Sequence, residues 1–560
     1  MKLDIREIPF SRFGSYFCVS QEKDNQDIYI RDVHGGDEAP SRLFKLGLLK
    51  DGQPCDAEVE ASEIAVKLSV KGDSSRFAEI IIPEEDELHI QVQGVTLSLE
   101  PENGKYDSFM ELSENLYEYH IYSKELKLML VKLAGVMDIE APWNTIGNHF
   151  IRIHLQDGHF VLRNYRTVYK EKQYDDFATG KEKLSVQYEK WFSHMSKGYN
   201  DAEFMPSLER ASYITWANFV RPEGVLPGYA MYMSKLWMYN IWSWDNCFGA
   251  LLLAEKYPEL AYDQINIFIE HQDESGAYPD FVNDKFSSYN CIKPPIFLYT
   301  YEKLMAMNDY FKEETRLRAI YESSKKVMSY FAEYRTNTGC LPHYKHGNDS
   351  GWDNSSLFHA GMVVEAPDLA AFLIRSCDIL ASFAIILGEE EESVQFKQQA
   401  DQLFSLLMER LYDENGFFGR YGKNADPIQA RSSLILKLPI MIGYRLEEKV
   451  KQQLVRELAE HFEANFGLAT ERIDSPYYKE NGYWLGPIWA PVTYLFIDSL
   501  ASFGFEEMAK RLRDKFLQVT LVGGMAENFD PITGKGLVDT SFAWTSSVFL
   551  LFLHEKVTEA

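Results

Sequence analysis

Five short segments in the second part of the chain combine aromatic rings with carboxyl, amide or hydroxyl side chains. They are residues 242–246 (WSWDN), 351–355 (GWDNS), 483–489 (YWLGPIW), 527–530 (ENFD) and 542–545 (FAWT). Aromatic faces stack on the C–H faces of sugar rings, while carboxylates hold hydroxyl groups or transfer protons. Together the segments predict a carbohydrate site if the fold brings them to one place. For any single segment the simpler interpretation is that tryptophan fills a helix contact and aspartate caps a helix.

The elements that would position these segments are helices. From about residue 200 apolar residues follow helical spacing, as at Phe396, Ala400, Leu403, Leu407 and Leu411. A short pattern with glycine then recurs, 52, 63, 77, 51 and 57 residues apart, at Gly224, Gly276, Gly339, Gly416, Gly467 and Gly524. Glycine is favoured just after a helix end.

Each interval between these glycines holds two helices of ordinary length, and six such pairs turning the same way close into an (α/α)6 barrel. In a barrel of this kind the segments after each glycine gather at one end, which would bring the five aromatic segments together. Chance is the alternative, because many helices end in glycine.

The first 165 residues show the alternation of β-strands instead. Leu88, Ile90 and Val92 alternate with polar residues, and the alternation resumes after Gly94. Asp157-Gly158 lies between two more alternating runs and predicts a hairpin turn. We therefore expect an N-terminal antiparallel β-sandwich domain over residues 1–165, a linker with a helix over 166–200, and a mainly α, barrel-forming catalytic domain over 201–560.

Composition excludes several classes of function. The 560 residues carry 84 acidic and 57 basic side chains, a net charge of −27, so nucleic acid and anionic membranes are disfavoured as partners. The longest apolar stretch, residues 370–387, contains Arg375 and Asp378 and is predicted to be a core helix. Scattered cysteines and a charged N-terminus predict a cytoplasmic protein without zinc.

Residues 200–560 resemble glycoside hydrolase family 63 and, more distantly, family 37 trehalases. The matching stretches, in the order and spacing of the family, are WSWDNCF (242–248), HQDESGAYPD (271–280), GWDNSS (351–356), YWLGPIWAPVTYL (483–495), AENFDPITGKG (526–536) and FAWTSS (542–547). The resemblance implies an (α/α)6 barrel and an inverting enzyme that cleaves an α-glycosidic bond, with a small α-glucoside as the expected substrate.

The resemblance also implies two catalytic carboxyl groups, with Asp353 as general acid and Glu527 as general base. Inversion needs a protonated carboxyl to donate to the leaving oxygen and an ionised one to activate water, about 6.5–9.5 Å apart. Burial against Trp352 would raise the pKa of Asp353, whereas Glu527, next to polar Asn528, is expected to stay ionised. The alternatives are a helix N-cap for Asp353 and a loop carboxylate for Glu527.

Further residues are expected to bind the small carbohydrate. They are Trp242, Trp244, Asp245, Asn246, Gln272, Trp352, Tyr483, Trp484, Trp489 and Trp544. Leu485 replaces an arginine common in relatives, which weakens the case for an acidic aglycone such as glycerate. His343, His346 and His359 are interpreted as pocket residues without a metal. The sequence shows no glycine-rich phosphate-binding loop, so no nucleotide cofactor is expected.

Three other functions remain open alternatives: a glycoside phosphorylase, a sugar epimerase, and a sugar-binding protein without catalysis. A phosphorylase would replace the base by a phosphate site, an epimerase would be expected to carry paired histidines, and a binding protein would have lost one carboxylate. The sugar and linkage depend on long loops such as residues 283–295 and 343–352. The sequence leaves the oligomeric state open.

Overall fold

The structure is a computed structural model that describes residues 1–559, and it divides into two compact units. Unit 1 comprises residues 1–198, 212–240 and 283–286, and unit 2 comprises residues 199–211, 241–282 and the remainder from 287. The domain boundaries expected at residues 165 and 200 stay predictions. The unit division groups both the segment 166–198 and the segment 212–240 with the N-terminal residues.

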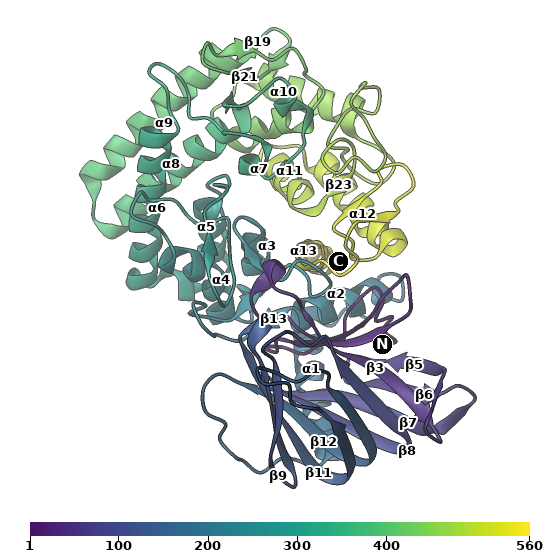
Figure 1. Cartoon of the computed structure of the whole chain (residues 1–560). Coiled ribbons are helices and arrows are strands. Elements are labelled where there is room, and N and C mark those ends of the chain that lie inside the picture. The colour runs from purple at the N-terminus through teal and green to yellow at the C-terminus, as the bar shows by residue number, and fades with distance from the viewer. Residues whose placement is uncertain (560) are drawn as a thin grey trace. The chain divides into compact units, whose positions relative to one another are not determined.

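Unit 1 is built on one antiparallel sheet of twelve strands (Figure 1). The strands are β1 (Phe17–Gln21), β2 (Ile28–Asp32), β3 (Arg42–Lys50), β4 (Gln53–Cys55), β5 (Ala57–Ala61), β6 (Val66–Val70), β7 (Asp73–Glu84), β8 (Glu87–Pro101), β9 (Ser108–Ser113), β10 (Leu116–Ile121), β11 (Leu126–Glu140) and β12 (Arg152–Tyr165). The path β1-β2-β3-β8-β12-β11-β10-β9 is extended by β4 on β3 and by β5-β6-β7 on β8. The predicted antiparallel β domain is confirmed, as a single hydrogen-bonded network.

Two glycine signals that resembled strand breaks lie inside continuous strands. Gly94, with φ +65°, lies within β8, and Asp157-Gly158 lies within β12. The pairing of β12 with β8 shifts register at Asp157, and the Asp157 carboxylate accepts a hydrogen bond from the Gly94 backbone N–H at 2.6 Å. The predicted hairpin at Asp157-Gly158 is therefore wrong. The pair forms a bulge that bends a long strand, which needs the same φ > 0 residues as a turn.

The rest of unit 1 is short apart from one helix. Its elements are α1 (Phe177–Ser196), η1 (Gly36–Glu38), η2 (Tyr122–Lys124), β13 (Phe219–Val220) and β14 (Ala230–Met231), while α2 (Met205–Ala217) continues from unit 2 into unit 1. Helix α1 begins after Asp176, whose side chain accepts from the Thr179 N–H at 2.9 Å. This cap satisfies a backbone donor that the first turn leaves free.

Unit 2 is helical. Its helices are α3 (Asp245–Leu253), α4 (Pro258–Glu270), α5 (Phe297–Met307), α6 (Glu314–Tyr334), α7 (Gly347–Ser350), α8 (Pro367–Leu387), α9 (Glu390–Leu411), α10 (Glu448–Glu457), α11 (Ala490–Ser502), α12 (Glu506–Gly523) and α13 (Ala543–Glu559). The 3-10 segments are η3 (Asp309–Lys312), η4 (Ser356–Phe358) and η5 (Leu434–Ile442), and η6 (Leu458–Phe462) is a π-helical turn that continues α10.

Six of these elements form a closed inner ring. Each touches the next in the order α3, α5, α8, η5, α11, α13 and back to α3. Helices α4, α6, α9, α10 and α12 pack on the outside of this ring (Figure 1). The inner positions explain the apolar stretch predicted as a core helix: it is α8, which is long and apolar enough to span a membrane but is mostly buried among its neighbours.

The glycine repeat marks the connection from each of these five outer helices to the next inner element and, at Gly224, the connection from α2 to α3. All six repeat glycines have positive φ, from +61° at Gly224 to +153° at Gly467. Gly524 directly follows α12 as a helix cap, whereas Gly276 and Gly416 lie five or six residues beyond their helices. The prediction that each glycine ends a helix is therefore corrected. Most of them form the tight turn that begins the segment leading back to the ring.

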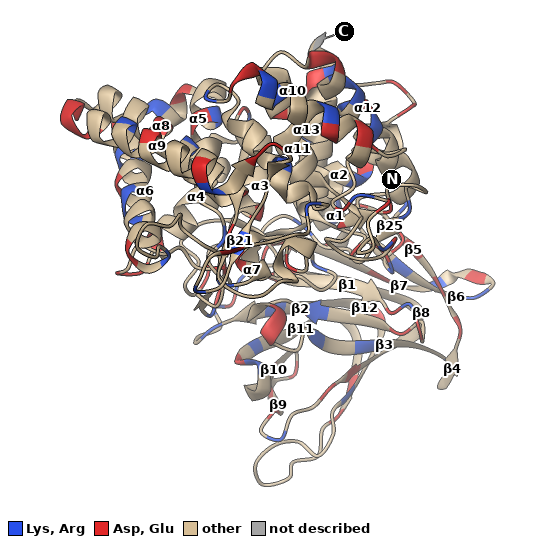
Figure 2. Cartoon of the chain, turned by 90° about the horizontal axis from the view of Figure 1, so that it is seen from above, with Lys and Arg blue, Asp and Glu red and all other residues tan. Residues whose placement is uncertain are grey.

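Short strand patches join these returning segments to one another. They are β15 (Ile241–Trp242), β16 (Phe281–Val282) and β17 (Ser287–Ser288); β18 (Val364–Glu365), β21 (Arg420–Tyr421) and β22 (Asp426–Pro427); β19 (Tyr412–Asp413) and β20 (Gly416–Phe417); and β23 (Ile488–Trp489), β24 (Asn528–Phe529) and β25 (Gly536–Leu537). The first and last patches fix segments of the predicted site. Acidic and basic residues are interspersed on outer helices such as α10 and α12 (Figure 2).

Candidate active site

The two predicted catalytic carboxyl groups are linked through the segment that carries Tyr483. Asn354, the residue after Asp353, accepts a hydrogen bond from the backbone N–H of Trp484 at 2.9 Å. The neighbouring Tyr483 hydroxyl donates to Glu527 Oε1 at 3.0 Å. Residues 353 and 527 are 174 positions apart in the sequence, so only the closed ring places their segments against one another.

Asp353 lies in a tight turn after α7. A Cβ added to Gly347 would lie 1.9 Å from the Asp353 carbonyl oxygen, so the first residue of α7 packs directly on the backbone of this turn. The helix N-cap that follows is Ser355, whose side chain accepts from the Leu357 N–H. The capping alternative therefore does not apply to Asp353, and its carboxyl group is left for other interactions.

Burial raises the pKa of Asp353, as the sequence predicted for a general acid. The positive charges of Lys293 and of His346, when it is protonated, oppose this shift by favouring the carboxylate. Asp353 nevertheless remains partly exposed, unlike most of its neighbours. A carboxyl group with a raised pKa at an accessible position is suited to donating a proton.

Glu527 directly precedes β24 and is 1% exposed. Its backbone N–H donates to the Asp539 carbonyl at 2.8 Å, and its Oε2 has no hydrogen-bond partner among residues 1–559. Burial, with the nearby Asp539 carboxylate, raises the pKa of Glu527 to about 8, against the smaller opposing effect of the Tyr483 hydroxyl. Contrary to the expectation that Glu527 stays ionised beside Asn528, its burial favours the protonated form, because packing removes the carboxyl group from water.

Asp245 is the first residue of α3 and is 5% exposed. Burial raises its pKa well above the ordinary value, and the charges of Asp280 and Asp353 add to that effect while Lys293 opposes it. The residue before it, Trp244, has φ +63°, a conformation that large side chains rarely adopt. Tyr483 has the same φ of +63°, so backbone strain is concentrated at two positions of the site.

Four predicted tryptophans form one continuous buried stack. The ring centroids of Trp352 and Trp484 are 4.9 Å apart, Trp484 and Trp489 are parallel at 3.9 Å, and Trp489 meets Trp544 edge-on at 5.5 Å. Each is at most 5% exposed. The rings therefore pack on one another in the interior of unit 2.

The stack also holds the backbone of the site in position. The Trp489 indole N–H donates to the Tyr483 carbonyl at 3.0 Å, and the Trp544 indole N–H donates to the Glu527 carbonyl at 3.3 Å. Trp244 joins the same region, because a Cβ on Gly351 would lie 2.9 Å from the Trp244 Nε1. All five aromatic segments singled out in the sequence are thus brought together.

Two predicted binding residues have their amide N–H groups engaged elsewhere, although the Asn246 Oδ1 is buried without a partner in the described chain. The Gln272 amide donates to the carbonyls of Gly276 at 2.8 Å and Ser323 at 2.9 Å, so it braces the loop after α4 against α6. The Asn246 amide donates to the Gln264 carbonyl of α4 at 2.6 Å. Both residues tie helices to their surroundings. Trp242 differs, because its half-buried ring lies on Phe281 at 4.6 Å while its indole N–H has no partner in the described chain.

Two charged residues that the sequence analysis did not name complete the cluster. The Lys293 ammonium lies 3.3 Å from Asp280 Oδ1, and the two side chains are only 8% and 7% exposed. Lys293 also donates to the Asn348 carbonyl at 2.6 Å. Asp280 ends the HQDESGAYPD stretch and Lys293 lies in the loop 283–295, so both were inside motifs of interest, but their pairing is a long-range contact.

Of the three histidines predicted as pocket residues, His343 and His346 both lie near Asp349, while the His359 ring packs edge-on against Tyr477 at 5.1 Å. His346 lies with Cys291 and Asp349, whose potential ligand atoms are all within 4.8 Å of one another. However, the Asp349 carboxylate already accepts from the buried Arg335 guanidinium at 2.6 Å. This group therefore fits an ion pair better than a metal ligand set.

The chain shares most of its second part with a known family. The family model described as mannosylglycerate hydrolase MGH1-like glycoside hydrolase domain matches residues 238–545. The mannosylglycerate hydrolase of Thermus thermophilus is 28% identical over 186 residues, which are 32% of this chain and 43% of that protein. The matched region thus spans less than half the length of that curated relative.

Two solved structures share the fold. The GH63 mannosylglycerate hydrolase from Thermus thermophilus in complex with Tris superposes with a TM-score of 0.54 at 19% identity, over 61% of this chain and 98% of that one. A bacterial glucoamylase complexed with acarbose superposes with a TM-score of 0.66 at 10% identity, over 99% and 94% of the respective chains. With its family match over more than half its length, the chain belongs to the MGH1-like glycoside hydrolase domains of glycoside hydrolase family 63.

Proposed function

We propose that this protein is an inverting glycoside hydrolase that cleaves the α-glycosidic bond of a small α-glucoside or closely related glycoside. The observation that carries the proposal is the Tyr483 segment, which hydrogen-bonds Glu527 on one side and the residue after Asp353 on the other. It joins two carboxyl groups that hydrolysis with inversion requires.

In this mechanism the Asp353 carboxyl donates its proton to the glycosidic oxygen as the C1–O bond breaks. Glu527 takes a proton from a water molecule that attacks C1 from the opposite face, so the anomeric configuration inverts. The unpartnered Glu527 Oε2 is the acceptor that this water needs, because Oε1 is already engaged by Tyr483. After the reaction Asp353 is ionised, Glu527 is protonated, and one water has been consumed.

The mechanism requires Glu527 to lose its proton before the reaction. Hydrogen bonds from water and from sugar hydroxyl groups favour the carboxylate form, so substrate binding lowers the pKa of Glu527 from about 8. The fixed donor Tyr483 acts in the same direction. Substrate binding and activation of the base are therefore coupled in this proposal.

The charges of the site support a neutral substrate. Asp245, Asp280 and Asp353 all interact with Lys293, whose charge is matched by Asp280. A phosphate co-substrate would meet these carboxyl groups without an arginine or lysine left over, which argues against the phosphorylase alternative. Glycerate, present in the name of the Thermus relatives, would likewise find no cationic side chain left over among these residues, so we rank neutral aglycones first.

Two fold assignments and a cellular location accompany the proposed function. We assign the ring of unit 2 to the (α/α)6 barrels and the sheet of unit 1 to the accessory β-sandwiches, supported by the closed order of inner helices and by the similarity to the glucoamylase. We also propose a cytoplasmic location, supported by six cysteines that are all free.

A substrate panel with two variants tests the proposal. The panel contains 4-nitrophenyl α- and β-glucosides and mannosides, α-linked disaccharides, and glucosyl- and mannosylglycerate. We expect α-glucosides to be cleaved, and Asp353→Asn and Glu527→Gln each to lower kcat by about 1,000-fold or more. Asp498→Asn is the matched control, because it lies eight residues into α11, about 12 Å along the helix from the site.

Full activity in either site variant, or hydrolysis confined to β-glycosides, would contradict the assignment. Circular dichroism of each variant separates loss of chemistry from loss of folding. A loss of activity in Asp498→Asn as large as that in Asp353→Asn would also contradict the assignment. The Asp353 carboxyl group would then affect activity only through the stability of the protein.

A further inference from the structure

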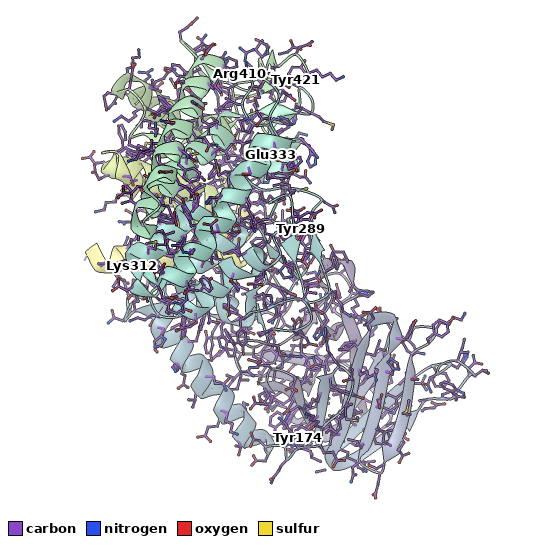
Figure 3. The ribbon with its side chains drawn as sticks, turned by 90° about the vertical axis from the view of Figure 1, so that its left-hand side faces the viewer. Tyr174, Tyr289, Lys312, Glu333, Arg410 and Tyr421 are labelled. Carbon is purple, nitrogen blue, oxygen red and sulfur yellow. The ribbon has the colours of Figure 1, made fainter. Side chains whose placement is uncertain are left out.

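Lys293 and Asp280 form a fixed ion pair inside the site that the mechanism above does not use. Lys293 lies in the loop between β17 and α5, a few residues beyond Tyr289 (labelled in Figure 3), and Asp280 directly precedes β16. Their side chains are less than a tenth exposed, and the charges of both interact with Asp353. The pair is therefore part of the surroundings of the proposed general acid.

Backbone hydrogen bonds hold both partners in place. The Asp280 carbonyl accepts from the Ser243 N–H, and its N–H donates to the Ser288 carbonyl, both at 2.7 Å. The Lys293 ammonium donates to the carbonyl of Asn348, in α7, which packs on the turn of Asp353. The backbone of Asp280 and the ammonium of Lys293 are therefore both fixed, which brings the two side chains into an ion pair.

Several polar atoms of this pair, of the strand beside Asp280 and of the proposed base are buried without a hydrogen-bond partner in the described part of the chain. They are Asp280 Oδ1, the Trp242 indole N–H and Glu527 Oε2. The ammonium of Lys293 is close enough to Asp280 Oδ1 for an ion pair, but its aligned hydrogen bond goes to Asn348 instead. Buried donors and acceptors without a partner need one, and within a site a ligand or a water can supply it. Here they comprise one donor and two acceptors, the requirement of a polyhydroxylated molecule.

We propose that Lys293 and Asp280 together bind two adjacent hydroxyl groups of the sugar ring whose glycosidic oxygen Asp353 protonates. Asp280 accepts a hydrogen bond from one hydroxyl, and Lys293 donates one to its neighbour. The pair is then a specificity determinant, because an epimer or a deoxy sugar leaves a buried charge unsatisfied. This inference rests on the proposed function, and it names the part of the substrate that the site reads.

The same charges make an anionic ligand a poor occupant. The ammonium of Lys293 is shared among Asp245, Asp280 and Asp353, all of which interact with it. A carboxylate or phosphate entering the pocket would add a further negative charge to this group, whereas hydroxyl groups add none. The ligand class is therefore a neutral polyhydroxylated ring.

A cycle that combines protein variants with deoxy substrates, in the manner of a double-mutant cycle, tests the binding role of the pair. The probes are 4-nitrophenyl α-D-glucopyranoside and its 2-, 3-, 4- and 6-deoxy analogues, with the wild type, Asp280→Asn and Lys293→Met. We expect each variant to lower kcat/KM for the parent about 10- to 100-fold, the range of a hydrogen bond to a charged group. For the one analogue that lacks the bound hydroxyl, the loss should shrink to within about threefold.

A second ion pair in the same unit provides the matched control. Lys303 and Asp498 also form a lysine–aspartate pair, partly buried between α5 and α11 and beyond the site. Lys303→Met should lower kcat/KM by the same factor for every analogue, because it acts through stability only. Coupling to a single hydroxyl is therefore a readout that a purely structural role of Lys293 would not produce.

A binding experiment separates failure of the pair from failure of the proposed function. We expect D-glucose to raise the melting temperature of the wild type, and the rise to vanish in Asp280→Asn. If glycosides are hydrolysed but each variant loses the same factor in kcat/KM on every deoxy analogue, the binding role of the pair is overturned and the proposed function stands. Glucose binding that depends on Asp280, without hydrolysis of any glycoside, overturns the proposed function alone, and the absence of both overturns both.

Discussion

Glu527→Gln should stabilise the protein at neutral pH while abolishing its activity. The substitution keeps the shape of the side chain and its acceptor for Tyr483, but it removes a carboxyl group that must be ionised in water and is held protonated by burial. A folded-state pKa of about 8 lies above the ordinary value of 4.5, so the folded protein binds a proton that the unfolded chain has released.

The sign and size of the effect follow from this difference. Below pH 4.5 the carboxyl is protonated in both states and contributes nothing. Between pH 4.5 and 8 each pH unit costs the folded wild type about 1.4 kcal/mol, which amounts to about 2 kcal/mol at about pH 6 and about 4 kcal/mol at about pH 7.5. The glutamine variant has no such cost. For a helical unit of this size the gain corresponds to melting temperatures higher by about 3 °C and about 6 °C respectively.

Scanning calorimetry of the wild type and Glu527→Gln between about pH 5.5 and about pH 8.5 measures this difference directly. The predicted result is a stability gain in the variant that grows with pH up to about pH 8 and then levels off. A variant that is less stable than the wild type, or a gain that does not change with pH, would refute the claim that burial holds the proton on Glu527. Asp498→Asn, outside the site, should show no comparable rise with pH.

Three further variants give distinct outcomes. Asp353→Asn should lose about 1,000-fold in kcat on a disaccharide but less than about tenfold on α-glucosyl fluoride, whose leaving group needs little protonation; initial rates on the two substrates compare these losses. Trp544→Phe removes the indole donor to the Glu527 carbonyl and should lower kcat about tenfold with little change in KM, measured by steady-state kinetics. Gly351→Ala combines a φ of +74° with a Cβ 2.9 Å from Trp244, so thermal unfolding should show a loss of about 2–4 kcal/mol.

The sequence predicted features that depend on local pattern. The glycine repeat identified six outer-to-inner connections, because a turn with positive φ favours glycine wherever it occurs. The five aromatic segments do converge, since they follow those turns or begin inner helices. Asp157-Gly158 was misjudged for a related reason: a bulge within a long strand and a two-residue hairpin require the same residue types.

Features that depend on tertiary packing could not be predicted from the sequence. The protonation of Glu527 is set by the packing of its segment, including the indole of Trp544 above its backbone, and nothing in the letters ENFD reports that. The pairing of Lys293 with Asp280 joins two loops that only the ring brings together. Asn246 and Gln272 lie in the right motifs, yet the structure uses their amides to tie helices.

The stereochemistry of hydrolysis tests the central claim most directly. Proton NMR follows the anomeric signals in the first minutes after the wild-type protein is added to an α-glucoside that it cleaves. The roles of Asp353 and Glu527 predict that the β-anomer of the released sugar appears first and that the α-anomer grows only by mutarotation. Initial release of the α-anomer would show retention and would contradict the assignment of Glu527 as a base acting on water.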